Sequence, residues 1–139
     1  MPNAVFIDAR RNPMDCCFSA FKQNFARGQS FSYGLEVVGD YYQEYRAMMK
    51  HWHSVMPGRV KEVNYENIVN NLEYEVKVLL DHCGLAFEKA CVDFHKTKRS
   101  VRTASAQQVR QPIYRSGVEH WRNYETWLGP LKEALTNKD

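Results

Sequence analysis

The chain has 139 residues, which fits one domain or part of one, and its 44% hydrophobic and 25% charged residues are ordinary for a folded protein. This balance excludes a disordered chain, and the apolar runs are too short to span a bilayer. The formal net charge is +3, but residues 96–122 contain seven basic residues and one acidic residue, so the rest of the chain sums to −3. Such local positive charge indicates a defined anionic partner.

Targeting and metal-binding signals are weak in this sequence. Residues 1–9 lack the basic and long apolar segments of a signal peptide, so we expect a cytoplasmic protein. No two of the four cysteines form a C-x-x-C pair, and we expect reduced thiols. His51 and His53 are two residues apart, a spacing that does not bring two rings together on a helix, and we expect no metal site.

The first half of the chain predicts a strand followed by two helices. Residues 4–8 form a short apolar run typical of a buried strand. Asn12 suits a helix N-cap and Pro13 the first helical position, so we expect a helix over about residues 13–26 with Ser19 off its apolar face. A loop at 28–34 leads to a long helix at 35–56. An apolar stripe along that helix predicts core packing by Val38, Tyr41, Tyr42, Tyr45, Met48, Met49, Trp52, Val55 and Met56.

The second half predicts one more strand and several shorter helices. Pro57 and Gly58 end the long helix, and residues 59–65 are expected to form the strand. An amphipathic helix is expected at 67–83, closed by Gly84, and a short one at about 87–95. The basic stretch 96–116 has no strong periodicity and is expected to be an ordered loop. The last helices are expected at about 117–127 and 130–137.

This order of elements predicts an α/β fold with two short parallel strands and a mostly helical remainder. Two strands make a poor sheet by themselves. We therefore interpret residues 1–139 as a single domain that is part of a larger α/β domain.

Arg11 and Ser19 are the first candidate binding residues. The amides of a helix N-terminus attract an anion, and an arginine at the end of the preceding strand adds a bidentate donor that matches a phosphate. Ser19 adds a hydroxyl donor farther along the helix. The alternative interpretation is structural, with Arg11 paired to a carboxylate such as Asp8 or Asp15.

The stretch "RNPMDCCFS", residues 11–19, resembles the 3′-phosphate-binding motif of sulfotransferases that use 3′-phosphoadenosine 5′-phosphosulfate (PAPS). In that family an arginine ends a strand and a serine eight residues later completes the phosphate site, which is the spacing of Arg11 and Ser19. "VNYENIV" resembles the later strand-to-helix turn, where Tyr65 matches a tyrosine beside the adenine. "FHKTKRSVRTASAQQVRQPIYRSGVEHWRNY", residues 94–124, is similar to the C-terminal nucleotide loop of bacterial sulfotransferases associated with tetratricopeptide repeats, relatives of tyrosylprotein sulfotransferases.

The resemblance implies a partial P-loop-like sulfotransferase fold and a site for PAPS or its product, adenosine 3′,5′-bisphosphate. It implies sulfuryl transfer to a hydroxyl of a peptide or small-molecule acceptor, with Ser105 stabilising the charge that develops in transfer. The implied nucleotide-binding residues are Arg11, Ser19, Tyr65, Arg102, Thr103, Ala106, Gln107, Gln108, Val109, Arg110, Gln111, Pro112, Ile113, Tyr114, Arg115 and His120. Two positions depart from the family pattern: Gln23 replaces a basic residue, with Lys22 adjacent, and His120 replaces a lysine.

Two elements of the family site match no residues of this sequence. No G-x-x-x-x-G-K or related loop for the 5′-phosphosulfate occurs in it. None of the histidines at 51, 53, 82 and 95 matches the base that deprotonates the acceptor. We expect both elements to lie upstream of Met1, and we expect the chain alone to be inactive.

Three functions stay open at this point. The first is an enzyme, the C-terminal part of a PAPS-dependent sulfotransferase that is active with its missing N-terminal half. The second is a catalytically inactive, truncated nucleotide-binding or protein-interaction module, which includes a homodimer. The third is a nucleic-acid binder, which we do not expect because the aromatic residues follow helical spacing and are not interleaved with the arginines. We also expect no membrane partner.

Overall fold

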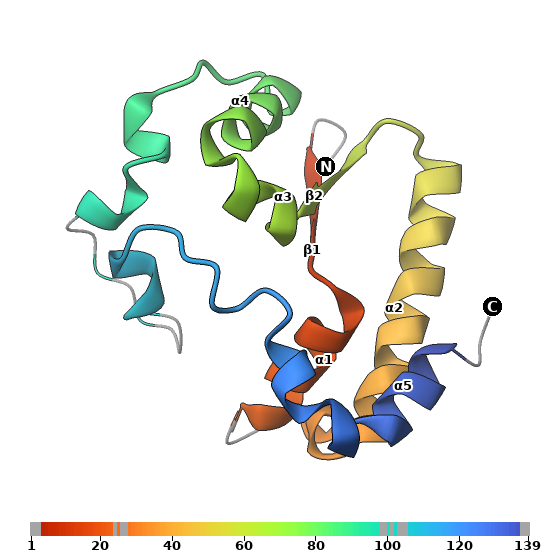
Figure 1. The fold of residues 1–139 in the computed structure, drawn as a ribbon. Coiled ribbons are helices and arrows are strands. Elements are labelled where there is room, and N and C mark those ends of the chain that lie inside the picture. Colours follow the sequence, from red (N-terminus) through yellow and green to blue (C-terminus); the bar gives the residue numbers. More distant parts are fainter. Residues whose placement is uncertain are drawn as a thin grey trace. The chain divides into compact units, whose positions relative to one another are not determined.

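The computed structural model confirms the α/β class and the two parallel strands in one sheet (Figure 1). β1 spans Phe6–Arg10 and β2 spans Val60–Asn64, within a residue of the expected second strand. The structure describes residues 4–23, 25, 28–97, 100, 102 and 106–136. The chain divides into two units, which are described separately. The strand unit comprises Met1–Arg10 and Lys61–Arg115, and the helical unit comprises Arg11–Val60 and Ser116–Asp139.

In the strand unit, the helix expected at 67–83 is two helices. α3 spans Tyr65–Asn70 and α4 spans Leu72–His82. Asn71 separates them with φ −148° and ψ 66°, outside the helical region. Asparagine side chains compete with the backbone for hydrogen bonds, which explains a break at the consecutive Asn70 and Asn71.

The end of α4 confirms the glycine cap. Gly84 has φ +67°, which glycine adopts without steric cost. The Gly84 amide donates to the Asp81 carbonyl at 2.9 Å, and the Leu85 amide donates to the Leu80 carbonyl at 2.9 Å. These two bonds satisfy carbonyls that the helix end leaves open.

The rest of the strand unit is made of short turns. The segment expected as a helix at 87–95 consists of two 3₁₀ helices, Lys89–Cys91 and Phe94–Lys96. The basic stretch contains a further 3₁₀ helix at Gln108–Arg110. In the part of the unit that is described, the buried apolar residues are only Val63 and Val69, so its core is thin.

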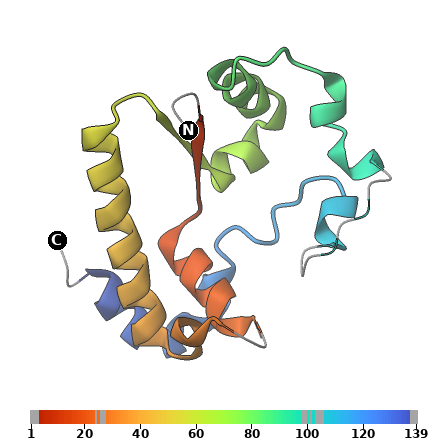
Figure 2. The ribbon, with the colours of Figure 1, turned by 180° about the vertical axis from the view of Figure 1, so that it is seen from behind.

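The helical unit contains the main core. α1 spans Pro13–Lys22, α2 spans Leu35–Val55 and α5 spans Gly129–Thr136. Two 3₁₀ helices, Ser30–Tyr33 and His120–Trp127, complete it, so the helix expected at 117–127 has 3₁₀ geometry. Figure 2 shows α5 alongside α2, as does Figure 1. The buried core consists of Cys17, Phe18, Val38, Leu128 and Leu131.

Core packing along the whole stripe of α2 is a wrong prediction. Val38 is buried, but Tyr41, Met48, Trp52 and Val55 are between 40% and 52% exposed. The helix is 21 residues long, and the core of this unit packs against its N-terminal half, at Leu35, Val38 and Tyr42. Helical periodicity identifies an apolar face without identifying what covers it.

The cysteines are four free thiols. Burial, with a smaller effect of the neighbouring Cys16, raises the pKa of the Cys17 thiol to about 12. A thiol with that pKa stays protonated at neutral pH and is a poor nucleophile. Cys17 is therefore a core residue and no candidate for catalysis.

Within the described residues, no helix combines the length and the apolar character that crossing a membrane requires.

Gly39 tests the contact between α2 and α5. A Cβ at this position would lie 2.6 Å from Ala134 Cβ and 3.3 Å from Leu131 Cδ1, both on α5. We expect Gly39→Ala to lower the free energy of unfolding by about 1–3 kcal/mol, because the clash outweighs the better helix propensity of alanine. Gly129→Ala is the control, since a Cβ there meets no atom within 4 Å. Urea denaturation of both variants measures the difference, and equal stabilities would contradict the packing described.

Candidate functional site

The side chain of Asn12, the N-cap residue, caps the start of α1. Asn12 Oδ1 accepts hydrogen bonds from the amides of Met14 at 3.0 Å and Asp15 at 3.3 Å. This confirms Asn12 as the N-cap and Pro13 as the first helical residue. Asn12 therefore occupies two of the helix N-terminal amides that could otherwise bind an anion. The side of α1 is the better candidate for a phosphate site.

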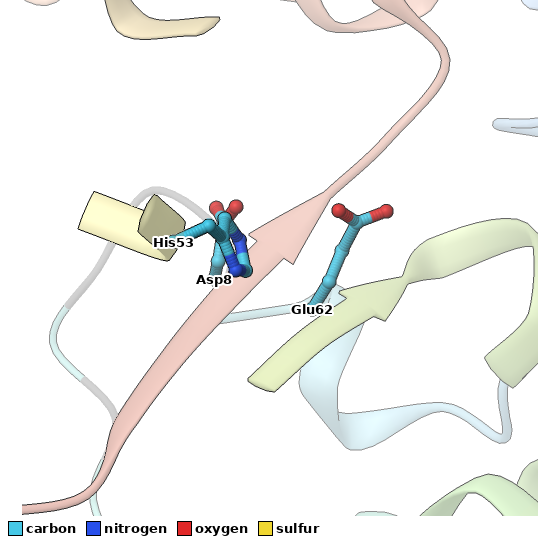
Figure 3. Close-up of side chains that lie close together, drawn as sticks. All are labelled: Asp8, His53 and Glu62. Atoms are coloured by element: carbon cyan, nitrogen blue, oxygen red, sulfur yellow. The ribbon is translucent and has the colours of Figure 1, made fainter. Parts of the chain in front are cut away.

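The two arginines between β1 and α1 have different roles. In the strand unit, Arg10 Nε lies 2.7 Å from Asp8 Oδ2, and Arg10 Nη1 lies 2.7 Å from Glu62 Oε2. Asp8 stands on β1 and Glu62 on the neighbouring strand β2 (Figure 3). Asp8 is buried, and a buried carboxylate needs such a partner. Arg10 therefore joins the two strands.

Arg11 belongs to the helical unit, where it contacts the C-terminal segment. Its Nη2 donates a hydrogen bond to the Gly117 carbonyl and lies 3.8 Å from Asp15 Oδ1. Arg11 therefore pairs with a carboxylate, as the alternative interpretation predicted, and that carboxylate is Asp15. Asp8 pairs with Arg10 instead. A quarter of the Arg11 side chain remains exposed, so its role in the fold leaves part of the side chain accessible.

Asp15 is a residue whose role the sequence did not reveal. It is 1% exposed, and its two carboxylate oxygens accept hydrogen bonds from backbone amides of a distant segment. Oδ2 accepts from the Glu119 amide at 2.7 Å, and Oδ1 accepts from the Trp121 amide at 3.1 Å. Together with Arg11, Asp15 ties residues 117–121 to α1.

One side of α1 gathers three polar groups. Ser19 is exposed, as expected from its position off the apolar face, and Lys22 lies one helical turn further on the same side. Lys22 Nζ lies 3.0 Å from His120 Nε2, and 4.8 Å from the centre of the Phe18 ring. An ammonium has only donors, so at this distance Lys22 donates to His120 Nε2, and its remaining hydrogens and the Ser19 hydroxyl are the groups that can donate to an anion.

Lys22 is not among the nucleotide-binding residues that the family resemblance implies. The family pattern places a basic residue at Gln23, and the sequence shows only that Lys22 is adjacent. The three-residue spacing from Ser19 was the available signal, because residues three apart are neighbours on a helix surface.

The remaining candidate residues that are described lie in the strand unit. Tyr65 begins α3, directly after β2, and its hydroxyl donates to the Tyr114 carbonyl at 3.2 Å. This bond ties α3 to the end of the stretch from Ala106 to Arg115. In this stretch Ala106, Ile113 and Tyr114 are half-buried, while its other members, Gln107, Gln108, Val109, Arg110, Gln111, Pro112 and Arg115, are exposed. Arg102 is exposed as well.

Ser105 and Thr103 lie outside the described residues, so their predicted roles stay predictions.

Part of the positive charge of residues 96–122 is paired locally. Lys96 Nζ lies 3.0 Å from Asp93 Oδ2, and the hydrogen bond lowers the pKa of that carboxyl. Arg122 Nη2 lies 2.8 Å from Glu119 Oε1, which raises the pKa of the guanidinium. Both pairs are exposed and contribute little to stability.

Comparison of the sequence with known proteins shows which family it matches. Residues 1–89 match the sequence model of a family described as "Sulfotransferase family". The chain is also 41% identical, over 137 residues, to an uncharacterized protein of Aquifex aeolicus (strain VF5), an alignment that covers 96% of this chain and 18% of that protein. The chain thus spans less than a fifth of that relative's length. No solved structure gives a significant match.

We expect Tyr65→Phe to loosen the stretch 106–115, because it removes the hydrogen bond to the Tyr114 carbonyl. A lost bond of this kind costs about 1 kcal/mol. Hydrogen exchange should become faster at the amides of 113–115 and stay unchanged in α4. The matched control is Tyr74→Phe, since Tyr74 is 58% exposed on α4. Equal exchange rates in the two variants would show that this bond does not hold the stretch in place.

Proposed function

The chain belongs to the sulfotransferase family, and from this premise we propose that it binds the 3′-phosphate and adenosine of PAPS or of adenosine 3′,5′-bisphosphate. The observation that carries the proposal is the group of donors along α1. Ser19 is exposed there, and Lys22 and His120 lie 3.0 Å apart beside it. A phosphate can accept hydrogen bonds from the Ser19 hydroxyl and from the Lys22 hydrogens that do not point to His120, and bonds to charged groups are the stronger ones.

The second part of the proposal concerns the adenosine. Tyr65 offers an aromatic ring at the start of α3, and its hydroxyl is bonded to the stretch 106–115. That stretch exposes Arg110 and Arg115, whose guanidinium groups suit phosphate oxygens. We propose that Tyr65 and this stretch contribute to the binding of the adenosine.

For the whole protein we propose sulfuryl transfer from PAPS to a hydroxyl of a peptide or a small molecule. Such a transfer requires the reacting groups to be positioned and the developing charge to be stabilised. Of the residues that the family resemblance assigns to transfer, this sequence matches Ser105. We therefore expect the isolated chain to bind nucleotide without transferring sulfate. Turnover of PAPS with a phenolic acceptor would overturn this part of the proposal.

We expect calorimetry to show tighter binding of adenosine 3′,5′-bisphosphate than of adenosine 2′,5′-bisphosphate, which carries the same charge on the neighbouring hydroxyl. A charge-assisted bond is worth about 1.5–3 kcal/mol, which corresponds to about tenfold or more in affinity. Lys22→Ala and Ser19→Ala should weaken binding of the 3′,5′ isomer, with the larger loss for Lys22. Lys77→Ala is the control for Lys22, because Lys77 is an exposed lysine on α4 paired with Glu73.

Because the 2′,5′ isomer carries the same charge, comparing the two isomers separates recognition of the 3′ position from general attraction of the nucleotide to positive charge. Equal affinities for the two isomers would refute the proposed 3′-phosphate site, even if both bind well. Arg11→Ala is less informative as a first variant, because Arg11 also holds the Gly117 carbonyl and its loss affects the fold.

We also propose that the chain self-associates through β1. Within the residues that the structure describes, the sheet has two strands and β2 is the strand that pairs with β1, and Val5, Phe6 and Ile7 are 45–48% exposed. An open strand edge with apolar neighbours is a template for pairing. We expect light scattering to show a dimer, and we expect Phe6→Lys to shift it toward the monomer, because a charge at an edge opposes pairing. Tyr33→Lys, at another exposed aromatic residue, is the control, and a wild-type monomer would refute the claim.

A further inference from the structure

We propose that Asp15 is a positioning residue for the phosphate site, because its carboxylate holds the backbone at 119–121 in the one conformation that places His120 beside Lys22. This inference rests on the proposed function, because the effect of Asp15 is expected in the binding of a 3′-phosphate. Asp15 itself is buried and is not expected to touch the nucleotide.

The hydrogen bonds of Asp15 restrict the backbone on both sides of His120. Its two oxygens accept from the amides of Glu119 at 2.7 Å and Trp121 at 3.1 Å. The amide donors of a backbone have fixed directions, so both bonds form together in only a narrow range of dihedral angles. Because buried carboxylates are found with their bonds satisfied, this range is strongly preferred.

The conformation that Asp15 selects is an unusual one. Glu119 has φ 54° and ψ 20°, and it is the non-glycine residue with positive φ in the part of the chain that the structure describes. Side-chain-bearing residues adopt this left-handed region at an energetic cost, so the surrounding structure must impose it. A left-handed residue next to right-handed ones turns successive amides toward a common point, which forms a concave anion site. Here the Asp15 carboxylate is the anion that occupies it.

His120 follows directly from this geometry. Its neighbours on both sides are bonded to Asp15, and the 3₁₀ helix His120–Trp127 begins at this residue. The imidazole lies 3.0 Å from Lys22 Nζ, with ring centres 6.2 Å from Phe18 and 5.6 Å from Tyr124. A change in the dihedral angles of Glu119 would turn His120 away from Lys22 and remove the imidazole acceptor that holds the ammonium in place.

The test compares Asp15→Asn with Asp15→Asn combined with Glu119→Gly. Asparagine keeps the shape of aspartate, but its NH₂ group faces one backbone amide and cannot accept its hydrogen bond. We expect the preference for adenosine 3′,5′-bisphosphate over the 2′,5′ isomer to fall about tenfold, the loss of one charge-assisted bond. Glycine adopts positive φ freely, so Glu119→Gly in the Asp15→Asn chain should restore the preference. Glu36→Gln, at an exposed carboxylate in the first turn of α2, is the control and should leave the preference unchanged.

If Asp15 only stabilised the fold, Glu119→Gly would not restore the preference, so rescue by glycine is the result specific to positioning. An unchanged preference in folded Asp15→Asn would overturn the inference, and so would a loss that Glu119→Gly does not restore. If Asp15→Asn fails to fold, Glu119→Val tests the same point with Asp15 in place, because a β-branched residue disfavours positive φ. We expect the same loss of preference, and wild-type preference in that variant would overturn the inference.

Failure of the proposed function gives a different result. If the wild-type chain shows no preference between the isomers, the nucleotide proposal fails, but the backbone claim is still tested by hydrogen exchange. The amides of Glu119 and Trp121 should be protected in the wild type and should exchange faster in Asp15→Asn. Equal exchange at both amides would overturn the positioning role independently of any ligand.

Discussion

The Asp15 carboxylate joins the first helix of the helical unit to a segment 104 residues further along the chain, through the amides of Glu119 and Trp121. Its burial makes these bonds costly to break, since an unpaired carboxylate is unfavourable away from water. Arg11 reinforces the same junction through the Gly117 carbonyl. The placement of His120 and the packing of Trp121 against the core both depend on this junction.

The chemistry of the candidate site follows from what this junction leaves exposed. The first amides of α1 are occupied by Asn12, and Arg10 is occupied by two carboxylates of the strands. In the helical unit, the Ser19 hydroxyl and the Lys22 ammonium remain accessible along the side of α1, and Lys22 lies beside His120 and the Phe18 ring. Such a set of donors on rigid elements suits a single phosphate group better than an extended polyanion.

Local signals predicted the features that depend on local bonds. Asn12, Pro13 and Gly84 end or begin helices where expected, and Ser19 is exposed as its position on the helix indicated. The partners of Asp15 could not be predicted, because a bond across 104 residues leaves no periodic trace. The left-handed Glu119 is imposed by that bond and contradicts the preference of the residue itself. The exposure of Tyr41, Met48, Trp52 and Val55 on α2 could not be predicted, because an apolar face does not specify what covers it.

Nuclear magnetic resonance mapping tests the central claim most directly, namely that the phosphate site lies on α1 and the segment joined to it. The labelled chain is titrated with adenosine 3′,5′-bisphosphate, and the shifts of backbone amides and of the His120 ring are followed. We expect the largest changes at Ser19, Lys22 and residues 117–121. Changes confined to 106–115, with Ser19, Lys22 and His120 unaffected at saturation, would contradict it.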